Sequence, residues 1–175
     1  MKKTLRILLP FCILLVLSLA IGCSDDDPAA VVDPPVPDPP HPAGAIGVFA
    51  DPAGTDPNIV DTGSMVTVYV IHKVENGAMA SEFKVEPPEG WTWSGSQTPF
   101  LSIGDVRYGV SLAYGECQIG SVHIMTVSYM SPGNTPPGST FQVLPHFQLP
   151  SINVVDCQDN MYNDGIGMVS PVVQP

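Results

Sequence analysis

The ten residues MVTVYVIHKV, from Met65 to Val74, alternate in the way that a β-strand requires. Successive side chains of an extended chain point to opposite faces, so the valines at 66, 68 and 70 share one face. Residues 122–129 (VHIMTVSY) repeat this alternation. Neither face of either segment is wholly polar, and the pattern therefore predicts two central strands.

Shorter apolar segments surround these two and predict further strands at 46–50, 80–85, 108–113, 140–144, 152–155 and 168–173. Turn-forming residues separate most of them, at 51–54, 75–77, 87–90, 131–134 and 163–165. No remaining segment has the length and period of a helix. The sequence therefore predicts an all-β fold, an antiparallel β-sandwich of about eight or nine strands, with residues 43–175 as a single domain.

The first 22 residues have the layout of a signal peptide. A basic start is followed by an apolar run from Ile7 to Ala20, and three aspartates follow soon after Cys23. The run is shorter than the roughly 20 apolar residues of a membrane-spanning helix. The alternative is an ordinary secretion signal with an incidental cysteine, which would show the same basic start and apolar run.

Residues 20–23 (AIGC) resemble the lipobox of bacterial lipoprotein precursors. The resemblance implies removal of residues 1–22 and attachment of lipid to Cys23, which anchors the chain in a bacterial cell envelope. More than one acyl chain is needed for stable attachment to a membrane. Ser24 follows the cysteine in place of the aspartate that favours retention in the inner membrane, so the resemblance points to the outer membrane.

Residues 23–42 read as an acidic, proline-rich tether, in which no apolar positions form a buried face. After the signal is removed, three basic residues (Lys73, Lys84 and Arg107) remain against 17 acidic ones, a formal charge of −14. So acidic a chain repels nucleic acid and suits cations or basic partners. We therefore exclude nucleic-acid binding.

The order of the predicted strands resembles cohesin-like and other immunoglobulin-like modules of bacterial surface proteins. The segments that carry this resemblance are Val66 to Ile71 leading into 75–77, residues 82–85, and Gly120 to Val127. It implies a sandwich fold and, for a cohesin-type module, docking of a partner protein. Fold alone does not establish that function.

Cys117 and Cys157 form an even pair once Cys12 and Cys23 are set aside. An exported protein meets oxidising conditions, so we predict a disulfide between them. A metal or redox site is the alternative, but there is no Cys-x-x-Cys, and neither His123 nor His146 has ligand spacing from either cysteine.

The tetrapeptide Asp61-Thr62-Gly63-Ser64 resembles the signature of aspartic proteases. That chemistry needs two carboxylates that share a proton, and no second copy of the motif is present. The same residue types also build a plain turn. A protease acting through Asp61 is therefore a remote alternative.

Trp91 and Trp93 are two residues apart and would share one face of an extended strand. The pair offers a carbohydrate-binding surface, and packing in the core or at an edge is the structural alternative. The structural alternative is favoured, because a small sandwich needs its few aromatic residues in its core.

Acidic residues cluster twice, at Asp51, Asp56 and Asp61 and again at Asp156, Asp159 and Asp164, with Asn160 and Asn163 between the last three. Carboxylate and amide oxygens are the ligands that calcium prefers, so a calcium site is a hypothesis, although the spacing is not that of an EF-hand. Solvated turn residues are the alternative.

Other enzyme motifs are missing, including His-Glu-x-x-His, Gly-x-Ser-x-Gly and a phosphate-binding glycine loop. We therefore expect a membrane-anchored extracytoplasmic binding module without catalytic activity, whose protein or glycan partner the sequence does not name.

Overall fold

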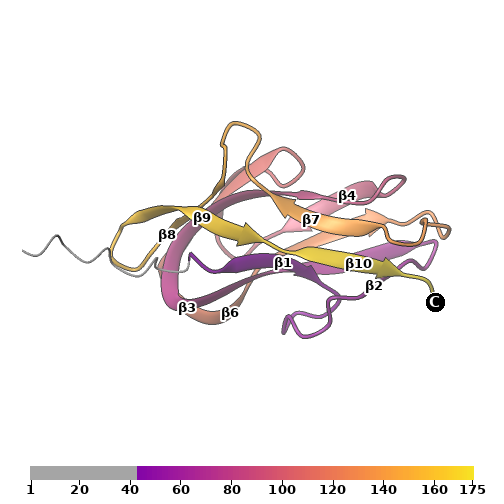
Figure 1. Ribbon diagram of the computed structural model, residues 1–175, viewed down its shortest axis with the longest axis horizontal. Helices are drawn as coiled ribbons and strands as arrows, with labels where there is room; N and C mark the ends of the chain where they lie inside the picture. Colours follow the sequence, from indigo (N-terminus) through magenta and orange to yellow (C-terminus); the bar gives the residue numbers. More distant parts are fainter. Residues whose placement is uncertain (1–42) are drawn as a thin grey trace, which may run out of the picture. The chain divides into compact units, whose positions relative to one another are not determined.

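The computed structural model describes residues 43–175 (Figure 1). The predicted signal peptide, Cys23 and the tether lie outside the described residues. Within the described part the chain forms strands and no helix, so it holds no helix long enough to cross a membrane. The strands are β1 (Ala45–Phe49), β2 (Ile59–Val60), β3 (Met65–Glu86), β4 (Thr92–Gln97), β5 (Leu101–Asp105), β6 (Gly109–Met130), β7 (Thr140–Leu144), β8 (Ile152–Val155), β9 (Met161–Gly167) and β10 (Val169–Val173).

The two longest strands, β3 and β6, pair antiparallel along almost their whole length and curve together (Figure 1). The predicted turn at 75–77 is wrong, because the chain passes through it as a bend within β3. The register shifts between Val74 and Ala78, and Gly77 has a φ of 89°. A side chain there would also collide with the disulfide, since an added Cβ would lie 2.4 Å from Cys157 Sγ. Glycine is therefore required at this bend.

The bend divides the strand pairings into two sets. Before it, β3 pairs with β1 and β6, and β6 pairs with β4; we call β1–β3–β6–β4 the first set. After it, the second set runs β9–β8–β3–β6–β5. The remaining strands attach beside the second set, with β7 on β3, β10 on β7 and β2 on β10.

The all-β class is confirmed, but the arrangement departs from the prediction in two ways. The pairs β1–β9 and β2–β10 are parallel, so the fold is not wholly antiparallel. Because β1 pairs with β9 as well as with β3, the strands β1, β9, β8 and β3 form a closed ring of pairings. Ten strands are present in the described part, rather than eight or nine.

The core lies on the inward faces of the long strands. Val68 and Val70 are fully buried, as the alternation predicts. Ile71 was expected on the opposite face, yet it is also fully buried, because the register shifts after Val70 and the loop at Gly54 covers it. Full burial of each such side chain stabilises the fold by about 1.5–3 kcal/mol.

Candidate functional site

The outward face of the second set carries an apolar row. Each of five residues stands directly opposite the next across four strand pairs, so they line up across the sheet. Leu101 at one end is 70% exposed and Met161 at the other end is 63% exposed. The row consists of Met161 (β9), Val155 (β8), Ala80 (β3), Ala113 (β6) and Leu101 (β5).

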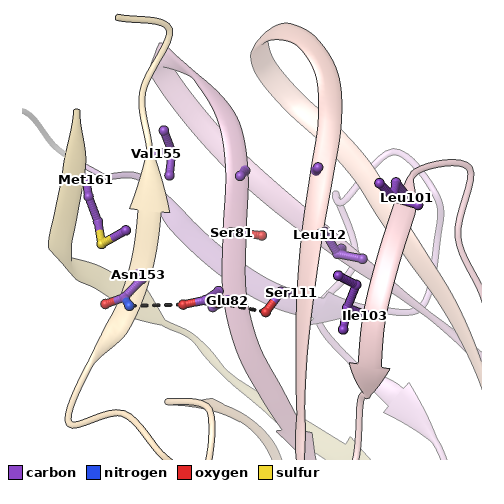
Figure 2. Close-up of a pocket in the computed structure, with 11 residues that line it drawn as sticks. Ser81, Glu82, Leu101, Ile103, Ser111, Leu112, Asn153, Val155 and Met161 are labelled. Carbon is purple, nitrogen blue, oxygen red and sulfur yellow. Dashed lines mark hydrogen bonds between the residues drawn. The ribbon is translucent and has the colours of Figure 1, made fainter. Parts of the chain in front are cut away.

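The neighbouring row on the same face is polar in its centre. Glu82 of β3 stands opposite Asn153 of β8 and Ser111 of β6. The Ser111 hydroxyl donates to Glu82 Oε1 at 2.7 Å, and the Asn153 amide donates to Glu82 Oε2 at 3.1 Å (Figure 2). These two bonds fix the carboxylate in one position. Ile103 of β5, 74% exposed, ends this row.

Together the two rows form a groove, which we call the outer-face groove. Its floor is low because Ala80 and Ala113 are small, and Figure 2 shows Leu101 and Ile103 on one side and Val155 and Met161 on the other. The cavity between them has a volume of about 190 Å³. Its shape and its apolar walls suit a bound apolar segment, and its one fixed carboxylate would orient a hydrogen-bond donor.

On the buried face of β3 and β6, beneath the groove, a chain of hydrogen bonds links the two strands. The Ser81 hydroxyl lies 2.7 Å from the Tyr114 hydroxyl, which lies 2.9 Å from His72 Nδ1. His72 Nε2 lies 3.0 Å from the Ala43 carbonyl, which only accepts, so Nε2 carries the proton and Nδ1 accepts from Tyr114. Burial lowers the pKa of His72 and raises the pKa of Tyr114. Both side chains are therefore neutral and hold β3 to β6 beneath the groove.

At its far end the groove face is covered by the loop between β7 and β8. The His146 ring lies on Gly109, the next outward position of β6 beyond Ser111, and an added Cβ at Gly109 would be 2.0 Å from His146 Cδ2. The loop is also tied to the turn between β5 and β6, since the Phe147 N–H donates to the Tyr108 carbonyl at 3.0 Å. The open part of the face is thus limited to the two rows.

Trp91 and Trp93 do not form the exposed pair that the carbohydrate hypothesis requires. Trp91 is 6% exposed and packs edge-on against Phe141, with ring centroids 5.0 Å apart, and against Tyr129 at 6.4 Å. Its indole N–H donates to Thr135 Oγ1 at 2.8 Å. Trp91 is therefore a core residue.

Trp93 is partly buried against the core and lies under a cation. The Arg107 guanidinium is 4.1 Å from the centre of its indole ring. Within residues 43–175, two buried side-chain polar atoms lack a hydrogen-bond partner, Trp93 Nε1 and the hydroxyl of Tyr129. The two residues stand opposite each other in β4 and β6.

Asp61 is 1% exposed, and its hydrogen bonds join its own turn to the loop that contains Gly133 and Thr135. Its carboxylate accepts from the Gly133 N–H at 2.8 Å, the Thr135 N–H at 2.9 Å, the Thr135 hydroxyl at 2.6 Å and the Gly63 N–H at 3.2 Å. Burial raises the pKa of Asp61, but these hydrogen bonds outweigh burial and hold the pKa well below its ordinary value of 3.8. No second carboxylate is bonded to it in the described part of the chain, so the structure gives Asp61 no partner with which to share a proton.

The acidic residues of the calcium hypothesis are not gathered into one site. Asp156 Oδ1 accepts from the backbone of Gln158 and Asn160, both at 2.8 Å, so it closes the turn between β8 and β9. Asp159 lies in the same turn with a φ of 64°, while Asp164 lies in β9 and lines a separate depression with Lys73.

The early acidic residues also serve turns. Asp51 accepts from Ala53, Thr55 and Asp56 of its own loop. Asp56 accepts from Asn58. Among residues 43–175, no three His, Cys, Asp or Glu side chains are placed to hold a metal ion.

The predicted disulfide is present. Cys117 of β6 is bonded to Cys157, just after β8, with their Cα atoms 5.2 Å apart. The bond joins β6 to the turn that leads into β9. It therefore supports the wall of the groove that Val155 and Met161 form.

Sequence reasoning missed the groove residues. The alternation of Leu101, Ser102 and Ile103 was a signal for a strand with one apolar face, but β5 is short and follows the poorly apolar β4. Glu82 gave no signal, because its partners Ser111 and Asn153 are 29 and 71 residues away in the sequence.

The fold is similar to that of cohesin modules. The third ScaB cohesin of R. flavefaciens, solved in complex with a group 1 dockerin, matches with a TM-score of 0.50 at 16% identity, covering 75% of this chain and 97% of that one. The cohesin CaCohA2 of Clostridium acetobutylicum, in its complex with CaDoc0917, also gives 0.50, at 10% identity over 75% and 99% of the two chains. A non-cellulosomal cohesin of Archaeoglobus fulgidus gives 0.48 at 12% identity, over 74% and 91%. No protein-family model and no curated protein matches the sequence.

Proposed function

We propose that this chain is a non-catalytic interaction module that binds a partner protein through the outer-face groove. The observation that carries the proposal is the apolar row from Met161 to Leu101, which lies in register across five strands and is exposed at both ends. Apolar surface arranged in this way is typical of an interaction site rather than of scattered surface residues.

The energy available at this surface is sufficient for specific binding. Leu101, Ile103 and Met161 are each exposed by more than three fifths, and burying each of them would contribute about 1–2 kcal/mol. Glu82 lies between them with its position already fixed by two hydrogen bonds, so binding would cost little ordering of that side chain. An N–H donor of the partner, placed opposite Glu82, would give the complex its register.

The class of partner is proposed from the fold and the charge. Two of the cohesins of similar fold were solved with dockerins, which supports a protein partner for this chain as well. The described residues contain three basic and twelve acidic side chains, and this charge favours a neutral or basic partner.

The proposal also includes the fold, which we take to be the predicted β-sandwich. The first and second sets are its two layers, and β3 and β6 join them.

The location of the module is a further part of the proposal. The layout of residues 1–22 and the lipobox supports a lipid anchor on Cys23, the tether at 23–42 and placement in the outer membrane of a bacterial envelope. Incorporation of labelled palmitate that is lost in Cys23→Ala would support the anchor. Separation of inner and outer membranes would then test the location, and an unlabelled wild-type protein would contradict the anchor.

A photo-crosslinking amino acid at Ile103 tests the groove directly in intact cells. We expect a discrete crosslinked product that depends on position 103 and is absent when the same amino acid replaces Thr67 on the outward face of the first set. Ala113→Arg, which fills the groove at an exposed position, should remove the product, whereas Thr67→Arg should not. A product of equal yield from both positions, or one that survives Ala113→Arg, would contradict the proposal.

A further inference from the structure

Two exposed aromatic residues lie on loops that are joined at the end of the second set, away from the open groove. Tyr108, in the turn between β5 and β6, is 61% exposed, and Phe147, in the loop between β7 and β8, is 66% exposed. The Phe147 N–H donates to the Tyr108 carbonyl at 3.0 Å, so the two loops are joined at this point. They form neighbouring projections in Figure 1. We call the two rings the aromatic platform.

The Tyr108 ring is supported by a cation. The Arg107 guanidinium lies 5.3 Å from the centre of the Tyr108 ring and 4.1 Å from that of Trp93. Asp105 fixes the guanidinium through two hydrogen bonds, one from Nε at 2.9 Å and one from Nη2. The Tyr108 ring is thus supported by a side chain that is itself anchored, which is the arrangement of a prepared binding surface.

Phe147 has comparable support. Its ring stacks on His146, with centroids 4.9 Å apart and an angle of 28° between the planes. His146 in turn lies against Gly109, where no side chain intervenes. Neither Tyr108 nor Phe147 contributes its own ring to the core, so exposure of both rings is not explained by the stability of the fold.

We propose that the aromatic platform binds a neutral polysaccharide. Flat aromatic faces stack on the C–H faces of sugar rings, while polar groups at their borders bond to the hydroxyl groups. Here the borders carry the Tyr108 hydroxyl, the exposed Gln148 that follows Phe147, and the Arg107–Asp105 pair. The site differs from the predicted one, which relied on Trp91 and Trp93 as a pair.

Charge selects a neutral sugar over an acidic one. Asp105 matches the charge of Arg107, so the platform offers no uncompensated cation. The excess of acidic residues in the described part repels polyanions.

Retention of the detergent-extracted full-length chain on insoluble cellulose, curdlan and mannan tests the proposal. We expect retention on at least one of these neutral polymers and none on polygalacturonate. The double variant Tyr108→Ala/Phe147→Ala should lower the retained fraction at least tenfold. Because both rings are exposed, its melting temperature should stay close to that of the wild type. Ala113→Arg, in the outer-face groove, is the matched control and should bind as the wild type does.

Two results would overturn the proposal. One is the absence of retention on every neutral polymer, and the other is equal retention of the double variant. If equal retention is accompanied by loss of the Ile103 crosslink in the double variant, the platform belongs to the protein interface instead. Since Ala113→Arg affects the groove alone, failure of the groove proposal and failure of this one are distinguishable.

Discussion

Asp61→Asn should destabilise the fold strongly, because the wild-type carboxylate only accepts hydrogen bonds. Its two oxygens receive four donors from Gly63, Gly133 and Thr135. In the variant one oxygen becomes an NH₂ group, which faces two of those donors and cannot accept from them. Two charge-assisted bonds worth about 1.5 kcal/mol or more each are then lost, and two donors stay buried without partners. We expect a loss of at least about 3 kcal/mol.

Thermal unfolding followed by tryptophan fluorescence measures this loss. For the described residues 43–175, an unfolding entropy of about 2.1 cal/mol/K per residue converts 3 kcal/mol into a fall in Tm of roughly 10 °C. Asp51→Asn is the matched control, since Asp51 also accepts four hydrogen bonds but from its own loop. That loop is open to solvent, and water can replace the lost acceptor, so the control should shift Tm much less.

The pH dependence gives a second test of the same reasoning. The folded chain holds the pKa of Asp61 below 3.8, and a carboxylate of this kind stabilises the fold above the unfolded pKa. As the pH falls below about 4 the unfolded chain takes up the proton first, so this stabilisation is progressively lost. The gap in Tm between wild type and Asp61→Asn should therefore narrow below pH 4. Equal shifts in Asp61→Asn and Asp51→Asn, or a fall in Tm of less than about 3 °C in the former, would refute the argument.

Two further predictions concern the other buried links. Reduction of the Cys117–Cys157 disulfide, which closes a loop over a sequence separation of 40, should cost about 4 kcal/mol on the chain-entropy model. Calorimetry with and without reductant measures this, and alkylation of two free thiols in the unreduced protein would contradict the bond. Burial lowers the pKa of His72, so the unfolded chain binds its proton more readily and stability should fall as the pH drops below about 6.5. Urea unfolding at pH 7 and pH 5 should show a smaller pH dependence in His72→Gln, and an unchanged dependence would contradict this.

The strands that the sequence predicted best are those whose pattern is local. Residues 140–144 and 152–155 are strands with the predicted bounds, and the valines of 66–70 face the core. Four strands were missed. The two-residue β2 is too short to show a pattern. The other three, β4, β5 and β9, are rich in Ser, Gly, Asn or Asp, and only pairing with β6, β8 or β1 makes them strands. The predicted turn at 163–165 lies within β9 for the same reason.

The candidate site was less predictable than the strands. Trp91 and Trp93 were considered together because they are neighbours in the sequence, yet one packs on Phe141 and the other under Arg107. The Asp61 motif suggested protease chemistry, but its surroundings supply four hydrogen-bond donors. In the described part of the chain, no second carboxylate is bonded to Asp61. In each case the identity of the contacting residues, many positions away, decided the role of the side chain.

The all-β class, the even cysteine pair and the acidic charge follow from the amino-acid sequence alone, because they depend on alternation, counting and composition. The two surfaces that we propose for binding arise only when the chain is folded. The outer-face groove exists because strand pairing places Ala80 opposite Ala113 and Val155, and the aromatic platform exists because a backbone hydrogen bond joins Tyr108 to Phe147. Register and loop contact bring together residues that are far apart in the sequence, and no local pattern specifies them.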